Sequence, residues 1–217
     1  MINLIRKDLI IVKKSIIIFI LLLIPITYGC YKLSNSFNFF AYVFIIFFMS
    51  YFTFTIMESF KYAKETLIVN SLPIKREEIV MHKYLMLILY VFIFGVVVML
   101  ETTLLKLFKV AGGSVASPWT IVVSLTLCLI IFSFYNPFSI NNTLGAQKLN
   151  SIIYIFVLVI PGVMKKALST SLGEKILNFI MGIKNINLIH LLFLCIGILF
   201  YFISFGICSK MYKLKDF

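Results

Sequence analysis

Residues 15–33 read SIIIFILLLIPITYGCYKL, and residues 37–57 read FNFFAYVFIIFFMSYFTFTIM. The first stretch contains one charged residue, Lys32, and the second contains none. A helix crosses the hydrocarbon core of a bilayer in about 20 residues. Hydrocarbon offers no water to the backbone, so each stretch is expected to be a helix that satisfies its own N–H and C=O groups. The short polar link between the two stretches predicts an antiparallel pair of membrane spans.

The rest of the chain repeats this pattern of apolar blocks. Four further blocks cover residues 84–105, 119–138, 149–164 and 188–208. Of the 217 residues 62% are apolar and 13% are charged, whereas a soluble domain is about half apolar and about a quarter charged. We therefore predict an all-α membrane protein, a single transmembrane domain over residues 1–217 with six transmembrane helices.

Two further segments carry an apolar stripe at helical spacing without being predicted spans. Residues 1–14, MINLIRKDLIIVKK, have apolar residues on one side and basic residues on the others, which predicts an N-terminal interfacial helix lying among the lipid headgroups. The alternative is that this segment is only the basic flank of the first span. Residues 165–187 carry a similar stripe, which predicts a helix that lies on the outer leaflet or re-enters it.

The cations indicate the orientation of the chain. There are 20 Lys and Arg residues against 8 Asp and Glu, a net charge of +12. They lie in the gaps between apolar blocks and form no separate basic face, which argues against nucleic-acid binding. With both termini inside, 13 of the 20 cations fall in inner segments, as the positive-inside rule requires. We predict a multi-pass protein of the bacterial plasma membrane with both termini cytoplasmic.

The sequence contains no motif of an enzyme. It lacks the GxxxxGK[ST] phosphate loop, HExxH and GxSxG. His82 and His190 fall on opposite predicted sides of the membrane, so they are not expected to share a metal. The 4 cysteines show no CxxC spacing and are predicted to be small buried residues. We expect no catalytic, metal-binding or cofactor-binding residue in this chain.

Glu101 is the one acidic residue predicted to lie inside a span, near the outer end of 84–105. A carboxylate at that depth is costly unless it is paired or hydrated. Two interpretations remain open: a polar group that lines a substrate path or outer gate, or an interfacial charge paired with Lys106 or reaching water.

The inner loop 58–83 differs from a loop that only sets topology, because it is long and of mixed charge. Residues 62–72 resemble a short helix, Pro73 ends it, and a new helix is predicted to start around Lys75. Glu77 and Glu78 then fall in the first turn, where the positive end of the helix favours carboxylates. This order of short helix, proline break and long helix suits a segment that transmits force from a cytoplasmic partner. A passive folded loop is the alternative.

Three places in the sequence resemble the membrane subunits of ABC-2-type exporters, specifically the small six-span permeases of Gram-positive bacteria. The N-terminal segment is similar to that family's opening interfacial helix. The segment KETLIVNSLPIKREEIVMHKYL is similar to its cytoplasmic loop pattern ETL…SLP…EI…KYL, and Pro137, Gly145 and Lys148 match its inner turn between the fourth and fifth spans. The chain departs from the family at Lys75, where a Ser or Thr cap is usual, so the capping box is lost.

The resemblance implies a half-transporter with the type V exporter-like permease architecture. Two permease chains, identical or sister chains, would pair in the membrane, and two cytosolic ATPases holding ATP and Mg would dock on the inner loop. The residues 165–187 would then be a re-entrant outer lid. Similarity to the phenol-soluble modulin exporters implies an amphipathic peptide as cargo. The implied ATPase-coupling residues are Lys64, Glu65, Thr66, Leu67, Ser71, Leu72, Pro73, Lys75, Arg76, Glu77 and Glu78.

Three other classes of membrane protein are alternatives. A substrate-binding membrane subunit of a vitamin importer would attach through a small-xxx-small helix face, which the first span lacks. That subunit would also need no charged coupling loop. A membrane-embedded enzyme would need paired ionisable groups at depth. The third alternative is a non-transporting accessory or immunity protein, which has no transport cycle.

Overall fold

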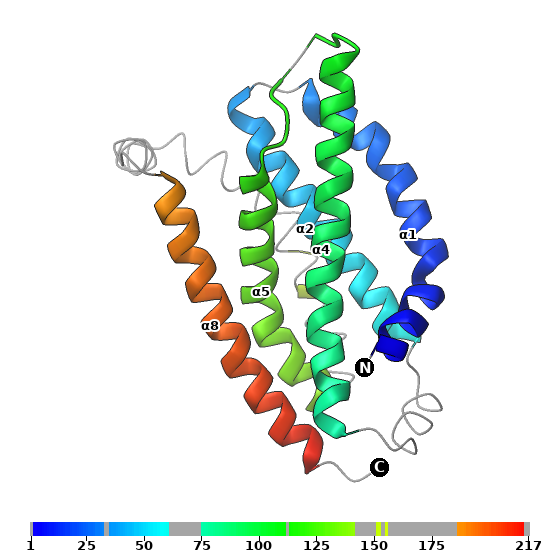
Figure 1. The fold of residues 1–217 in the computed structure, drawn as a ribbon, viewed down its shortest axis with the longest axis vertical. Helices are drawn as coiled ribbons and strands as arrows, with labels where there is room; N and C mark the ends of the chain where they lie inside the picture. The colour runs from blue at the N-terminus through cyan, green and yellow to red at the C-terminus, as the bar shows by residue number, and fades with distance from the viewer. Residues whose placement is uncertain are drawn as a thin grey trace.

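The computed structural model describes residues 2–32, 35–60, 75–111, 113–141, 151, 152, 155 and 186–214. Within these residues the chain forms long helices and no strand (Figure 1). The helices are α1 (Ile2–Tyr31), α2 (Asn35–Phe60), α4 (Arg76–Leu107), α5 (Pro118–Asn141) and α8 (Ile186–Lys213). All 5 are long and apolar enough to cross a membrane, which confirms the helical membrane class for the described part of the chain.

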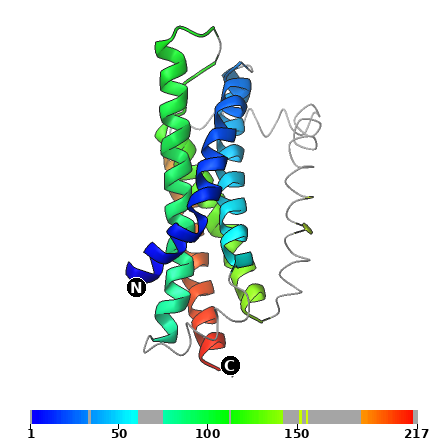
Figure 2. The same ribbon diagram turned by 90° about the vertical axis from the view of Figure 1, so that its right-hand side faces the viewer.

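The five helices lie along one long axis, some running up it and others down (Figure 1). We call the end that holds both chain termini the base and the opposite end the top. Helices α1 and α4 rise from the base, and α2, α5 and α8 descend toward it (Figures 1 and 2). The chain therefore passes from α2 to α4 at the base and from α4 to α5 at the top.

Five of the six predicted spans correspond to described helices. The predicted span 149–164 and the outer segment 165–187 lie largely outside the described residues. Helix α5 ends at the base and α8 begins at the top (Figure 1). A crossing between them, as predicted for 149–164, is consistent with these two ends.

The predicted interfacial helix over 1–14 is not confirmed as a separate element. Helix α1 continues without interruption from Ile2 to Tyr31, so residues 2–14 and the predicted first span belong to one helix. No glycine or proline before Pro25 interrupts the helix. The first turns of α1 are inclined to the remainder (Figure 2). Asp8 and Val12 are buried there, so part of the segment packs on the bundle.

The core is rich in aromatic side chains where α2 meets α5. The rings of Phe54 and Phe132 lie 4.7 Å apart edge to face, and the rings of Tyr51 and Phe132 lie 5.6 Å apart. Such contacts add about 0.5–1.5 kcal/mol to the burial of the rings. Many of the phenylalanines are therefore accounted for by helix packing.

The outward faces of α1 and α8 are apolar and exposed. Leu21 of α1 is 61% exposed and Phe202 of α8 is 70% exposed. In a chain whose helices cross hydrocarbon, these faces suit contact with lipid. Cys195 of α8 is also exposed, so the prediction that every cysteine is buried is wrong for this residue.

The connection between α4 and α5 is fastened to the tops of three helices. The backbone N–H of Gly113 donates to the carbonyl of Tyr31 at 2.6 Å, and the Tyr42 hydroxyl donates to the carbonyl of Ser114 at 3.1 Å. The N–H of Ala116 donates to Oγ1 of Thr102 at 3.2 Å. A Cβ at Gly113 would lie 1.4 Å from Nδ2 of Asn38, so only glycine fits this position without movement.

We expect Gly113→Ala to lower the free energy of unfolding by about 1–3 kcal/mol, the usual cost of overpacking. Thermal unfolding in detergent, followed by circular dichroism, measures the effect. The control is Gly206→Ala, because a Cβ there meets nothing within 4 Å. Equal melting temperatures for the two variants would contradict the close packing at Gly113.

Candidate functional site

The predicted ATPase-coupling residues divide into two groups. Those from Lys64 to Pro73 lie outside the described residues, whereas Lys75, Arg76, Glu77 and Glu78 are described. Helix α4 begins at Arg76, which agrees with the predicted start around Lys75, and both glutamates lie in its first turn. Lys75 is extended at φ −64° and ψ 133° and makes no side-chain capping bond, as expected where no Ser or Thr precedes the helix.

Helical structure covers both ends of the predicted inner loop. Helix α2 extends to Phe60 and α4 begins at Arg76, so the connection between them is shorter than the predicted 58–83. The start of α4 is bonded to the end of α8. Nη1 of Arg76 donates to the carbonyl of Lys213 at 2.7 Å, and the Lys213 ammonium pairs with the Glu77 carboxylate.

A largely buried ion pair lies deeper in the base, between α2 and α4. Nζ of Lys83 donates to Oε1 of Glu58 at 2.6 Å, with the two side chains 19% and 13% exposed. The hydroxyl of Tyr135 on α5 donates to the other carboxylate oxygen at 3.1 Å. Both oxygens of Glu58 are therefore engaged, as a carboxylate in an apolar interior requires.

A second buried pair joins α1 to α4. Oδ2 of Asp8 lies 3.4 Å from Nε2 of His82, and the two side chains are 1% and 4% exposed. Nζ of Lys7 lies 3.4 Å from Oδ1 of the same carboxylate. The sequence prediction missed Asp8. Its only signal is one carboxylate in an otherwise basic N-terminal segment.

Tyr84 connects α4 to α8. Its hydroxyl lies 2.7 Å from Oγ of Ser204 and donates to Sγ of Cys208 at 3.1 Å. Tyr201 donates to the carbonyl of Tyr84 at 2.9 Å, and Ser204 donates to the carbonyl of Ser133 on α5 at 2.7 Å. The base of the bundle thus contains a polar cluster that reaches every described helix; its members are Asp8, Glu58, His82, Lys83, Tyr84, Tyr135, Ser204 and Cys208.

Glu101 lies far from this cluster, in the upper part of α4. Its Oε2 accepts a hydrogen bond of 2.6 Å from Oγ1 of Thr27 on α1. Among the described residues, no ion pair joins Glu101 to Lys106. The carboxylate therefore faces α1 and bonds a neutral hydroxyl, which differs from the pairing considered from the sequence.

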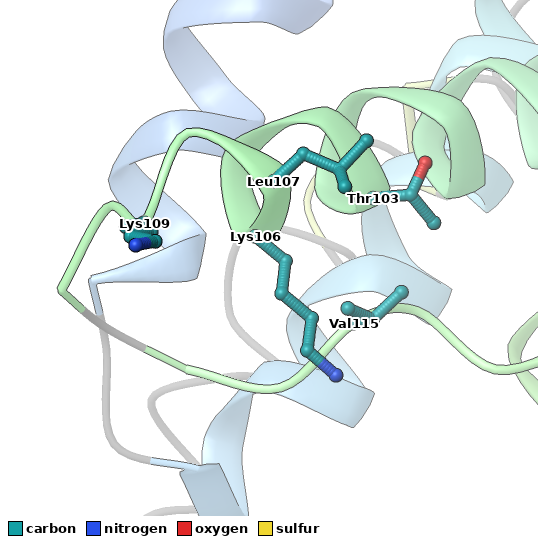
Figure 3. A pocket seen from close by; sticks show the side chains of 5 residues that line it. All are labelled: Thr103, Lys106, Leu107, Lys109 and Val115. Atoms are coloured by element: carbon teal, nitrogen blue, oxygen red, sulfur yellow. The ribbon is translucent and has the colours of Figure 1, made fainter.

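A shallow open hollow lies near the top of α4 (Figure 3). Two lysines, Lys106 and Lys109, contribute to its lining, and Glu101 does not. The other lining residues are Thr103, Leu107 and Val115. No side chain in this set forms a buried polar contact, so the hollow has no feature of a built binding site.

Nothing in the described part of the chain suggests a metal centre. No group of three His, Cys, Asp or Glu residues is placed there to hold an ion. His82 lies near the base and His190 near the top, where its ring stacks on Phe39 at 6.0 Å and lies 5.5 Å from Trp119. The two histidines are at opposite ends, as predicted.

The helices and their exposed apolar faces define a multi-pass α-helical membrane protein. A family model described as ABC-2 family transporter protein matches residues 3–213. The chain therefore belongs to the ABC-2 family of transporter proteins, the membrane components of ATP-binding-cassette transporters, and its resemblance to ABC-2-type permeases is confirmed. No curated protein and no solved structure shows significant similarity to it.

We expect Lys83→Met to destabilise the bundle by about 3–5 kcal/mol, because the Glu58 carboxylate would stay buried without its cation. The double variant Glu58→Gln/Lys83→Met should recover most of this loss, since no isolated charge remains. Thermal unfolding in detergent compares the two. Lys213→Met, which breaks an exposed pair at the same end, is the control and should melt like the parent. Equal melting temperatures for the single and the double variant would show that this pair is not buried as described.

Proposed function

We propose that this chain is the permease subunit of an ATP-binding-cassette exporter in the bacterial plasma membrane. It pairs with a second permease chain, identical or sister, and with two cytosolic ATPases that bind ATP and Mg. Membership in the ABC-2 transporter family supports the permease role and the ATPase partners. The partner ATPases then hydrolyse ATP, and this chain converts the movement of those subunits into movement of its own helices.

The observation that carries the proposal is the arrangement at the base. The starts of α1 and α4 and the ends of α2 and α8 lie there (Figure 1). The start of α4 is exposed and charged at Lys75, Arg76 and Glu77, and it leads into a continuous helix as far as Leu107. A partner that binds the connection 61–74 would act directly on a rigid element spanning the bundle.

The base is the cytoplasmic side in this proposal. The segments that join at this end hold 13 of the 20 cations when counted along the sequence. Cytoplasmic segments carry such an excess of Lys and Arg, so the proposed orientation and the proposed ATPase contact agree.

We further propose an amphipathic peptide as the cargo, because the small permeases that the chain resembles include exporters of such peptides. Glu101 is assigned to the outer part of the substrate path. Its carboxylate lies in the upper part of α4 and bonds the Thr27 hydroxyl of α1, so a separation of these helices would expose a polar group to the path.

Replacing residues 62–74 by a neutral Gly/Ser linker of equal length should abolish capture of the ATPase by the tagged permease. Co-purification from the native membrane, with mass spectrometry of the captured subunit, measures this. The replacement stops before Lys75 and leaves α4 intact. The control is Lys106→Ala/Lys109→Ala, which removes two cations at the top and should leave capture unchanged. Undiminished capture with the linker would exclude this connection as the docking segment.

The orientation predicts which side of the membrane each end faces. A cysteine at Lys109, in a background with Cys30, Cys128, Cys195 and Cys208 replaced by serine, should react with an impermeant maleimide in intact cells. A cysteine at Lys75 should react only after the membrane is opened. The reverse pattern would invert the orientation.

A further inference from the structure

We propose that His82, Lys83 and Tyr84 form a positioning joint that passes a displacement of α4 to the other helices. This inference rests on the proposed function, since it concerns how movement started by an ATPase reaches the bundle. None of the three residues belongs to the proposed docking segment, and none touches cargo in this proposal.

The joint consists of consecutive residues of one helix whose side chains contact different neighbouring helices. Successive side chains of an α-helix point about 100° apart. His82 is paired with Asp8 of α1, Lys83 with Glu58 of α2, and Tyr84 bonds α8 through Ser204 and Cys208. Tyr135 and Ser133 bring in α5, by donating to Glu58 and by accepting from Ser204. One short stretch of α4 therefore holds direct polar contacts to α1, α2 and α8, and it reaches α5 through Glu58 and Ser204.

The Glu58–Lys83 ion pair also joins the two helices on either side of the α2–α4 connection. Glu58 lies in the last turn of α2, and Lys83 lies about two turns into α4. The two helices that flank the proposed docking segment are thus joined to each other close to the end of α2 and the start of α4. A force on residues 61–74 would reach a coupled pair of helices, and α2 could not stay behind while α4 moved.

Polar contacts suit this role better than apolar packing does. Helices in hydrocarbon gain little from burying apolar faces against one another, because lipid tails are equally apolar. Dispersion contacts are individually small and non-directional, so apolar faces can slide. A buried ion pair instead depends strongly on distance and leaves two costly charges if it separates. His82, Tyr84 and Asp8 are each less than 5% exposed, and the side chains of Lys83 and Glu58 are 19% and 13% exposed, so these contacts are largely shielded from water.

The test measures a distance at the top of the bundle in variants that change the Glu58–Lys83 pair at the base. Non-cysteine spin labels, carried by encoded ketone residues at Lys32 and Leu107, report the distance between the tops of α1 and α4. Both positions are exposed. The labelled permease is purified with its ATPase in nanodiscs, diluted with unlabelled chain, and measured by electron–electron double resonance with and without ATP and vanadate.

The unmodified complex should show a nucleotide-dependent shift in this distance, and so should Lys213→Met, which breaks an exposed pair at the same end. Glu58→Gln/Lys83→Met should retain ATPase capture and lose the shift. The exchange Glu58→Lys/Lys83→Glu should restore it, because the pair reforms with opposite polarity. If the two residues only filled space, the nucleotide-dependent shift would not be lost in Glu58→Gln/Lys83→Met and recovered in Glu58→Lys/Lys83→Glu.

Each other outcome is decisive. A parental shift in Glu58→Gln/Lys83→Met would overturn the joint while leaving the proposed function intact. Loss of the shift in the exchanged pair as well would also overturn it. If the unmodified chain captures no ATPase, the proposed function fails and the joint with it; capture without any shift overturns the joint alone.

If Glu58→Gln/Lys83→Met does not fold, Tyr135→Phe replaces it. This variant removes one hydrogen bond to Glu58 and should reduce the shift; an unreduced shift would overturn the proposal.

Discussion

The ammonium of Lys83 lies largely buried between helices of an apolar bundle, where the Glu58 carboxylate accepts a hydrogen bond from it at 2.6 Å. An unpaired charge in such surroundings costs several kcal/mol, on the order of the whole stability of many proteins. The rotation of α4 is therefore constrained: its Lys83 side must face α2. Once that rotation is set, His82 faces α1 and Tyr84 faces α8, because neighbouring residues on a helix differ in direction by about 100°.

Most other serine and threonine side chains in the spans donate hydrogen bonds to backbone carbonyls of their own helix. Ser50 donates to the carbonyl of Ile46 at 2.7 Å, and Thr53 and Thr126 bond the carbonyls four residues earlier in the same way. Such bonds remove the cost of a hydroxyl in hydrocarbon without joining two helices. The interhelical polar contacts are consequently concentrated, with the largest group at the base and Thr27–Glu101 near the top.

This division of polar contacts gives the two ends of the bundle different properties. At the base, ionic and hydroxyl contacts link the helices that flank the proposed docking segment. At the top, the α4–α5 connection is held by backbone bonds and by the close approach of Gly113 to Asn38. For a member of the ABC-2 transporter family, a firmly linked base suits the side on which an ATPase acts.

The sequence by itself determined that this protein lies in a lipid bilayer and where most of its helices are. Uninterrupted apolar blocks define membrane spans because length and composition are local properties, and the charged start of α4 at Arg76 followed from Pro73 and the first-turn glutamates. Only the tertiary structure decided that residues 2–14 are part of α1, that Asp8 is buried against His82, and that Glu101 bonds Thr27. Periodicity shows which face of a helix is polar, but not which neighbour that face meets. That choice depends on how distant segments pack, and no local pattern records it.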